Sequence, residues 1–201
     1  MKVQGGSRGY RMTTRAESAA ATGERILDAA IELFWERPTD RIVLREVAER
    51  AGVTVQTVIR RYGGRAGLLA AAGERQIRAT EAERAVPVGD VDAAVGVLLE
   101  HYERNGAGVL RLLAAEESSP VLAEFAERGR RLHREWCRDA FRPLLTHLTG
   151  VDHDRRFAQV VAVCDVYTWK LLRLDSGLSR RQTHLALTEL LEPLLDNDGS
   201  H

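Results

Sequence analysis

The sequence predicts an all-α protein with about nine helices. Apolar residues recur at three- and four-residue spacing along most of the chain, which is typical of amphipathic helices. Aromatic residues make up only 5% of the sequence, and alternating runs of β-branched residues do not stand out. Glycine, proline and capping residues divide the apolar stripes into separate segments. We therefore expect an N-terminal three-helix unit followed by a larger helical lobe.

The first helix is expected to begin near Thr22, which can serve as its N-cap, and to end before Pro38. Its apolar stripe at 3.6-residue spacing comprises Ile26, Leu27, Ala30, Ile31 and Phe34. Residues 1–20 are rich in Gly, Ser, Thr and Ala. They carry basic residues at Lys2, Arg8, Arg11 and Arg15. This composition predicts a flexible basic arm.

Residues 44–62, LREVAERAGVTVQTVIRRY, predict two short helices joined by a turn. Leu44, Val47, Ala48 and Ala51 lie on one helical face. Gly52 can adopt the positive φ that the turn needs, and Thr54 can cap the next helix. Two helices joined by a short turn containing Gly form the helix-turn-helix unit, whose second helix enters the major groove of DNA. This segment therefore predicts DNA binding.

The net charge of zero conceals a difference between the two halves of the chain. Residues 1–85 hold 15 Lys and Arg against 11 Asp and Glu, whereas residues 86–201 hold 14 against 18. The segment 53–65 contains three arginines and no acid. A local basic patch of this kind is expected of a surface that binds phosphates.

The remaining helices are expected near residues 66–84, 90–104, 106–116, 119–148, 152–175 and 179–195. Gly63-Gly64, Pro87, Gly150 and Ser176-Gly177 separate several of them. We predict a DNA-binding domain at residues 21–66, an effector-binding and dimerisation domain at 67–196 and a disordered tail at 197–201.

Several classes of protein are disfavoured by the sequence. No apolar run approaches the roughly 20 residues that span a bilayer, and the N-terminus has no apolar signal segment. Two cysteines do not make a disulfide framework. A Walker loop, an HExxH motif and a Cys-x-x-Cys pair do not occur. We expect a cytoplasmic protein that is not an enzyme and requires no cofactor.

Residues 22–69 resemble the DNA-binding domain of the TetR (tetracycline-repressor-like) family of bacterial regulators. The matching segments are ERILDAAIELFWER, LREVAERAGV, TVQTVIRRY and GGRAGLL. The resemblance implies an all-α homodimer with a variable C-terminal ligand lobe. It also implies that a small molecule in that lobe changes the spacing of the two DNA-binding heads and releases operator DNA.

The chain departs from the family pattern at three places. Val43 stands where relatives usually have a capping Thr or Ser, so another residue must cap that helix, with Asp40 as the candidate. Ile59 replaces a tyrosine that usually contacts phosphate, and Arg61-Tyr62 replaces a His-Phe pair. These changes suggest that the contacts to the DNA backbone have been redistributed.

Phosphate contacts set the register of such a protein on DNA, and base contacts set its sequence preference. Val55 and Gln56 are predicted to contact bases, and Thr57 a base or a phosphate. Arginine contacts to the backbone are predicted from both helices and from the start of the next. The full predicted interface is Arg45, Thr54, Val55, Gln56, Thr57, Arg60, Arg61, Tyr62 and Arg65. The basic arm is either a solvated tail or a segment that follows the DNA.

The C-terminal lobe is predicted to hold the effector pocket, because such pockets are mostly apolar with a few polar groups. The candidate pocket residues are Tyr102, Phe125, His133, Trp136, Cys137 and Tyr167. Packing within the helical bundle is the alternative for each of them. His133 and Cys137 are four residues apart and could share a metal, but no third ligand is evident. Cys137 and Cys164 could form a redox pair or be ordinary buried residues.

The last two helices are expected to form a dimer interface, as a four-helix bundle across a two-fold axis. The predicted interface residues are Phe157, Val160, Val161, Cys164, Leu171, Leu187, Leu191 and Leu194. Intramolecular packing is the alternative. The favoured function is a homodimeric repressor that leaves operator DNA when it binds a small apolar or amphipathic molecule. An activator, or a regulator that needs no ligand, is the alternative with the same head.

Overall fold

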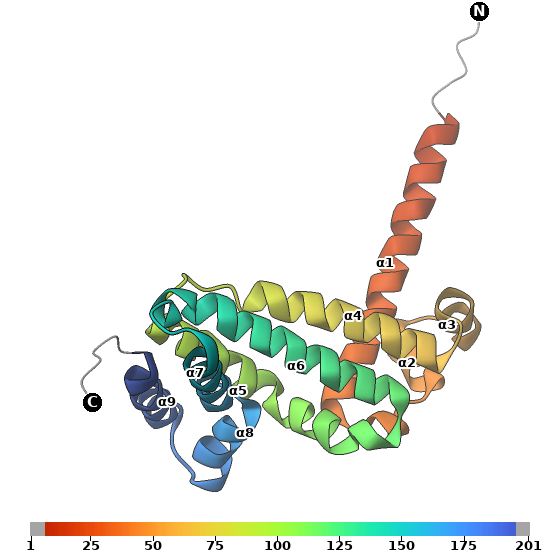
Figure 1. Cartoon of the computed structure of the whole chain (residues 1–201). Coiled ribbons are helices and arrows are strands. Elements are labelled where there is room, and N and C mark those ends of the chain that lie inside the picture. The colour runs from red at the N-terminus through yellow and green to blue at the C-terminus, as the bar shows by residue number, and fades with distance from the viewer. Residues whose placement is uncertain (1–6, 196–201) are drawn as a thin grey trace, which may run out of the picture. The chain divides into compact units, whose positions relative to one another are not determined.

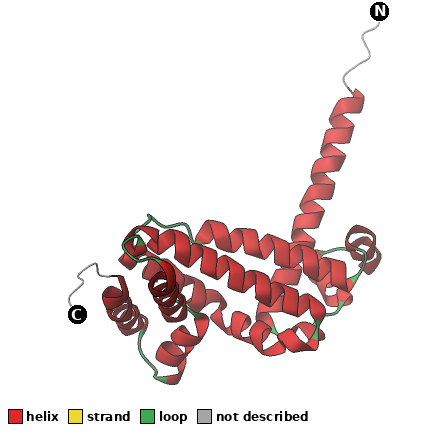
Figure 2. Cartoon of the chain, in the orientation of Figure 1, coloured by secondary structure: helices red, strands yellow, loops and turns green. Residues whose placement is uncertain are grey.

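The computed structural model describes residues 7–195, and every regular element in that range is helical (Figures 1 and 2). The all-α prediction is therefore confirmed for the described part of the chain. The chain divides into two compact units, Met1–Gln76 and Ile77–His201, with the division inside one helix. Each unit has its own apolar core.

The N-terminal unit contains α1 (Ser7–Glu36), the 3-10 turn η1 (Thr39–Arg41), α2 (Leu44–Ala51), α3 (Val55–Tyr62) and the first part of α4 (Arg65–Glu83). The helix α2 packs against both α1 and α3. Its core is built from the apolar stripes that the sequence predicts. The largest fully buried side chains there are Ile26, Leu33, Ile42, Val47, Val58 and Leu68.

The first helix begins earlier than predicted. It starts at Ser7 rather than near Thr22, and its first part extends beyond α2 and α3 (Figure 1). Thr22 lies inside the helix, where its hydroxyl donates to the Ser18 carbonyl over 2.8 Å. A threonine that bonds the carbonyl four residues back is not an N-cap. Residues 7–20 contain no proline and several alanines, so nothing in them stops the helix. Residues 1–6 and the tail at 197–201 lie outside the described residues.

The N-cap residue of α2, Val43, forms no side-chain capping hydrogen bond. The candidate cap, Asp40, lies in η1, and its side chain is outside the described part of the structure. Pro38 separates α1 from η1, as the sequence predicts.

The C-terminal unit contains α5 (Val91–Ala115), α6 (Pro120–Phe141), α7 (Gly150–Val163), α8 (Val166–Trp169) and α9 (Arg180–Leu195). Short 3-10 segments η2 (Glu116–Ser118) and η3 (Arg142–Leu145) follow α5 and α6, and a π-helical segment η4 (Lys170–Asp175) follows α8. The long α5 is central, because it packs against α6, α8 and α9. The helix α7 packs against α6 and α9.

Several predicted helices in this unit have wrong boundaries. The segment predicted at 119–148 is α6 only as far as Phe141, and the 3-10 segment η3 follows it. The segments predicted at 90–104 and 106–116 form the single helix α5, in which Asn105 and Gly106 are buried. Gly106 lies against the indole of Trp169, and a Cβ atom at this position would collide with that ring. The glycine therefore permits close packing and does not end the helix. The segment predicted at 152–175 is instead divided where Asp165 caps α8 by accepting from the Tyr167 amide.

Most of the predicted dimer interface is part of the core of a single chain. Phe157, Val160, Cys164, Leu187 and Leu191 are buried between α7, α9 and their neighbours. Val161 and Leu194 are half-buried against the same core. The helices α7 and α9 pack against each other, and the five buried side chains present almost no surface to a partner. Of the predicted set, only Leu171 is largely exposed, at 58%.

Candidate nucleic-acid interface

The turn between α2 and α3 has the geometry that the sequence predicts. Gly52 ends α2 with a φ of 66°, and its amide donates to carbonyls of α2. Thr54 caps α3 in an extended conformation, and its hydroxyl accepts a hydrogen bond from the Thr57 amide over 3.2 Å. The two threonine hydroxyls also lie 3.0 Å apart. This cap fixes the start of α3 relative to α2.

One face of α3 belongs to the core of the N-terminal unit. Val58 is fully buried, and Val55 and Tyr62 pack against the same core. Val55, a predicted base contact, lies in the first turn of α3, where its half-buried side chain packs on apolar neighbours. These three positions recur at helical spacing and define the side of α3 that faces inward.

Hydrogen bonds attach α3 and α2 to α1. The Tyr62 hydroxyl donates to the Gly23 carbonyl over 3.0 Å. The Arg25 Nε donates to the Ala51 carbonyl at the end of α2 over 3.3 Å. The predicted interface residue Tyr62 is therefore engaged within the chain. Its hydrogen bond fixes the C-terminal end of α3.

The opposite face of α3 is exposed and carries no acid. Gln56, Ile59 and Arg60 are exposed at positions that share one side of the helix. Ile59 is 39% exposed, which is unusual for a large apolar side chain on a helix of this unit. In the sequence alone, Ile59 is notable only as a departure from the family pattern. Its exposure follows from the burial of Val58, which turns residue 59 toward solvent.

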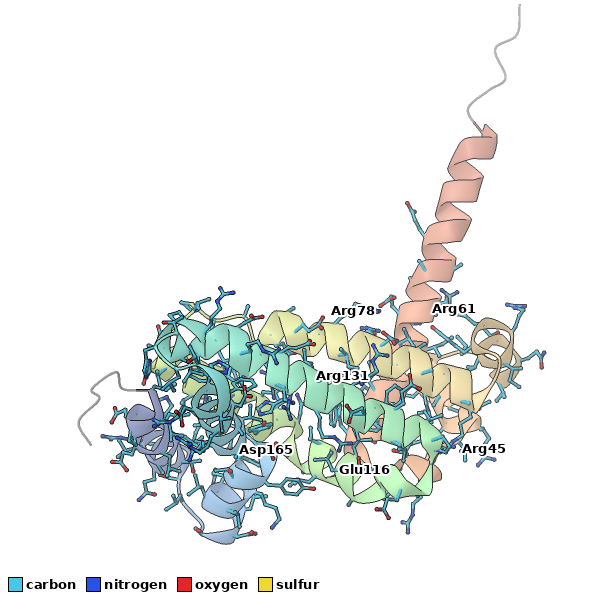
Figure 3. All side chains as sticks on the ribbon, viewed as in Figure 1. Arg45, Arg61, Arg78, Glu116, Arg131 and Asp165 are labelled. Carbon is cyan, nitrogen blue, oxygen red and sulfur yellow. The ribbon has the colours of Figure 1, made fainter. Side chains whose placement is uncertain are left out.

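A groove with a volume of about 820 Å³ lies between parts of α3 and α1. Three guanidinium groups and three hydroxyl groups contribute to its lining. The lining residues are Ser18, Ala19, Thr22, Arg25, Val53, Thr57, Arg60 and Arg61. Arg61 lies against Gly23 of α1, where any Cβ atom would meet its guanidinium (Figure 3). The groove is open to solvent and rich in donors, as expected of a surface for phosphate groups.

The arginines of α3 differ from three other arginines of this unit, which are paired with acids. Arg37 pairs with Glu46, Arg50 with Glu36, and Arg75 with Asp28. Within residues 7–195, neither Arg60 nor Arg61 forms such an ion pair. Their charges are therefore available to a ligand at the surface.

Arg45 and Arg65 have different surroundings. Arg45 is exposed near the start of α2 (Figure 3), and its Nε lies 3.7 Å from the Glu49 carboxylate. Arg65, predicted as a phosphate contact, donates to the carbonyls of Thr39 and Ile42. These bonds hold the η1 segment against the start of α4. The structure thus gives Arg65 a role inside the chain.

Four of the six predicted pocket residues meet in the C-terminal unit. Tyr102 of α5 and His133, Trp136 and Cys137 of α6 are adjacent to Arg84, which directly follows α4. The predicted residues Phe125 and Tyr167 are not part of this group, and Tyr167 is 53% exposed. Arg84 is not among the residues predicted from the sequence, because it ends the charged part of its segment, EAER.

Burial and nearby positive charges keep His101, next to Tyr102, neutral. Burial, together with the charges of Arg84 and Arg104, lowers the pKa of His101 to about 3. Its Nδ1 therefore accepts from the Asn105 amide at 3.4 Å, and the contact of 3.9 Å to Glu83 is not a charged pair. The pKa of the Cys137 thiol is lowered to about 6, first by a hydrogen bond from Cys164 and further by His133 and Arg84. Burial against this core raises the pKa of the Tyr102 hydroxyl.

Among the described residues, no helix is both long enough and apolar enough to cross a membrane.

Residues 26–72 match the model of a protein family, the bacterial regulatory proteins of the tetR family. This confirms the resemblance found in the sequence. The matched range runs from the core residue Ile26 of α1 into α4 and includes α2, the Gly52 turn and α3. No curated protein sequence matches the chain.

The fold is similar to those of solved bacterial regulators. The SmeT–triclosan complex is 22% identical, with a TM-score of 0.63 over 89% of this chain and 93% of that chain. A TetR transcriptional regulator from Rhodococcus sp. RHA1 is 22% identical, with a TM-score of 0.53 over 90% and 98% of the two chains. The fatty acid degradation regulator FadR from Bacillus halodurans is 16% identical, with a TM-score of 0.53 over 89% and 97%.

Proposed function

Residues 26–72 form a helix-turn-helix domain of the tetR family of bacterial regulatory proteins, and we propose that the whole chain is a transcriptional repressor. In this proposal two copies bind operator DNA through their α3 helices, and a small molecule bound in the C-terminal unit causes their release. The observation that carries the proposal is the exposed face of α3, which has unpaired arginines and no acid.

The exposed face of α3 supplies the sequence contacts. Gln56 can pair bidentately with adenine, and the apolar Ile59 can contact the methyl group of thymine. Thr57 lies between this face and the groove, where its hydroxyl is already shared with Thr54. The first turn of α3 and Ile59 therefore carry the base contacts in this proposal.

The basic groove supplies the backbone contacts. Arg60 and Arg61 contact phosphates from α3, and Arg45 does so from the start of α2. The ion pairs around Arg37, Arg50 and Arg75 leave these three arginines with little role in DNA binding. Tyr62 and Arg65 act indirectly, because their hydrogen bonds hold α3 and α4 in position.

The C-terminal unit is the site of the proposed effector. Its core combines a large apolar interior with a few buried polar groups, the composition expected of a small-molecule site. The group around Arg84, Tyr102, His133 and Trp136 is the candidate pocket lining. The SmeT structure contains triclosan and FadR regulates fatty acid degradation. Both names are consistent with an apolar or amphipathic effector for this chain.

The first experiment selects binding sites for the full-length protein from a library of randomised duplexes. The selected duplex is then used in fluorescence anisotropy titrations at several salt concentrations. We compare the parent protein with R60A/R61A and with R131A/R155A. The control pair removes the same charge from exposed positions of the C-terminal unit, where each arginine makes only local ion pairs.

We expect R60A/R61A to lose at least tenfold in affinity and to reduce the slope of log K against log salt by about 2. The control pair should match the parent. Equal affinity and salt slope for all three proteins would show that α3 does not bind the DNA backbone. A reporter gene with the selected operator placed inside its promoter then distinguishes repression from activation.

A further inference from the structure

Arg84 is a buried cation at the end of α4. It is 5% exposed. Its guanidinium carbon lies 5.4 Å from the ring centroid of Tyr102 and 5.6 Å from that of Trp136. The Trp136 indole also donates to the Arg84 carbonyl over 2.7 Å. The side chain is therefore held between one ring from α5 and one from α6.

Within residues 7–195, no carboxylate forms an ion pair with Arg84. Its Nε is buried and has no hydrogen-bond partner. Glu83, the residue before Arg84, lies 3.2 Å from Arg104, and Glu103 of α5 lies 2.7 Å from Arg173. Aromatic rings stabilise a buried cation only in part. A buried charge without an anion is therefore costly to the fold.

The imidazoles around Arg84 do not supply an acceptor for its Nε–H. His133 places Nδ1 3.5 Å from the Arg84 Nη1 and Nε2 3.3 Å from the Val161 carbonyl. With Nδ1 as acceptor, Nε2 carries the proton and faces the carbonyl and, at 3.7 Å, the Cys137 sulfur. His133 thus stands between Arg84 and the thiol. His101 is neutral and shared with Asn105.

We propose that Arg84 binds the carboxylate of an acidic, largely apolar effector, an inference that rests on the proposed effector role of this unit. The orphaned Nε–H lies on the edge of the guanidinium that binds a carboxylate bidentately. Tyr102 and Trp136 provide flat apolar surfaces beside the charge, against which an apolar group attached to the carboxylate can pack. The expected class of effector is therefore a monoanion with an apolar body, and no longer any amphipathic molecule.

The test measures binding to the full-length protein without DNA, so it is independent of the proposed operator contacts. The probes are decanoate and 1-naphthoate, each paired with its neutral amide, and binding is followed by calorimetry and thermal shift. The variants are R84M, which keeps an apolar chain of similar length, and R131M. Arg131 is exposed on α6, so R131M removes the same charge without altering the core.

We expect at least one carboxylate to bind the parent at least tenfold more tightly than its amide. R84M should lose this preference, and R131M should retain it. Circular dichroism confirms that R84M is folded, which is expected because the variant removes an unpaired buried charge. The proposal is overturned if amides and carboxylates bind the parent equally, or if folded R84M keeps the preference. Failure of both carboxylates to bind at about 1 mM would also overturn it.

Discussion

The hydroxyl of Tyr62 donates to the carbonyl of Gly23 over 3.0 Å and so links the last residue of α3 to α1. The accepting carbonyl is beside the position where the Arg61 guanidinium lies against α1. One polar link therefore positions both the helix proposed to read DNA and one of its two unpaired arginines.

Substitution of Tyr62 by Phe should destabilise the N-terminal unit by about 1 kcal/mol, because the substitution removes one hydrogen bond and leaves the Gly23 carbonyl without this donor. DNA affinity should fall as well, since α3 loses part of its attachment. Urea unfolding and anisotropy with the selected duplex measure the two effects. Tyr167→Phe is the control, because that ring is exposed. Unchanged stability in Tyr62→Phe would show that this bond contributes nothing in water.

Substitution of Gly106 by Ala should destabilise the C-terminal unit by about 1–3 kcal/mol, because the added Cβ would collide with the Trp169 indole. Gly129→Ala is a matched control in the middle of α6. There an added Cβ meets nothing within 4 Å, and the substitution should stabilise the protein by up to about 1 kcal/mol through helix propensity. Thermal unfolding followed by circular dichroism compares the two. Similar effects of both substitutions would contradict the close packing of α5 on Trp169.

The depressed pKa of His101 predicts a loss of stability in acid. The folded state lowers this pKa to about 3, mainly through burial and then through Arg84 and Arg104, whereas the unfolded chain titrates near 6.5. Between these values the unfolded state binds the proton and the folded state does not. Stability therefore falls as the pH is lowered from 6.5 toward 3, by at most about 1.4 kcal/mol per pH unit.

His101→Gln should reduce this dependence, because glutamine does not titrate. Urea unfolding of the parent and the variant at a series of pH values measures the difference in slope. His147→Gln is a control at an exposed position. An identical pH profile for the parent and His101→Gln would mean that His101 titrates normally in the folded protein.

The exposed apolar residues of η4 and α9 predict where two copies associate. Leu171 is 58% exposed and Leu185 is 56% exposed, unlike the buried stripes of α7 and α9. We expect Leu171→Glu or Leu185→Glu to weaken dimerisation at least tenfold in sedimentation equilibrium, because a charge would be buried at the interface. Val151→Glu, at a position that is 80% exposed on α7, should leave the dimer intact. Equal association of all three variants would place the interface elsewhere.

The DNA-binding elements could be predicted closely from the sequence because local signals determine them. Gly52 and Thr54 mark the end of α2 and the start of α3, and the structure has the expected left-handed glycine and hydroxyl cap. The base contact predicted for Val55 stays a prediction, because the side chain of this residue is only half-buried on α3. Its position in the first turn of α3 does not reveal that the side chain packs against the core.

The structure of the C-terminal unit was harder to predict, because its contacts join residues that are far apart in the sequence. Gly106 looks like a helix end until Trp169 is seen to occupy the space beside it. Arg84 looks like a solvated charge until Tyr102 and Trp136 are seen to enclose it. The positions of the apolar stripes of α7 and α9 were predicted correctly. Periodicity alone, however, does not show whether such stripes pack against their own chain or against a second copy.

The inward-facing and the solvent-facing residues of α3 tolerate substitution to different degrees. Val58 and Tyr62 maintain the fold, and the nearby Gly67 approaches the Tyr62 carbonyl so closely that no other residue fits there. Gln56, Ile59 and Arg60 face solvent, so their replacement would cost the folded state little. In the proposed DNA complex, substitutions at these three surface positions therefore change operator preference while the framework beneath them stays unchanged.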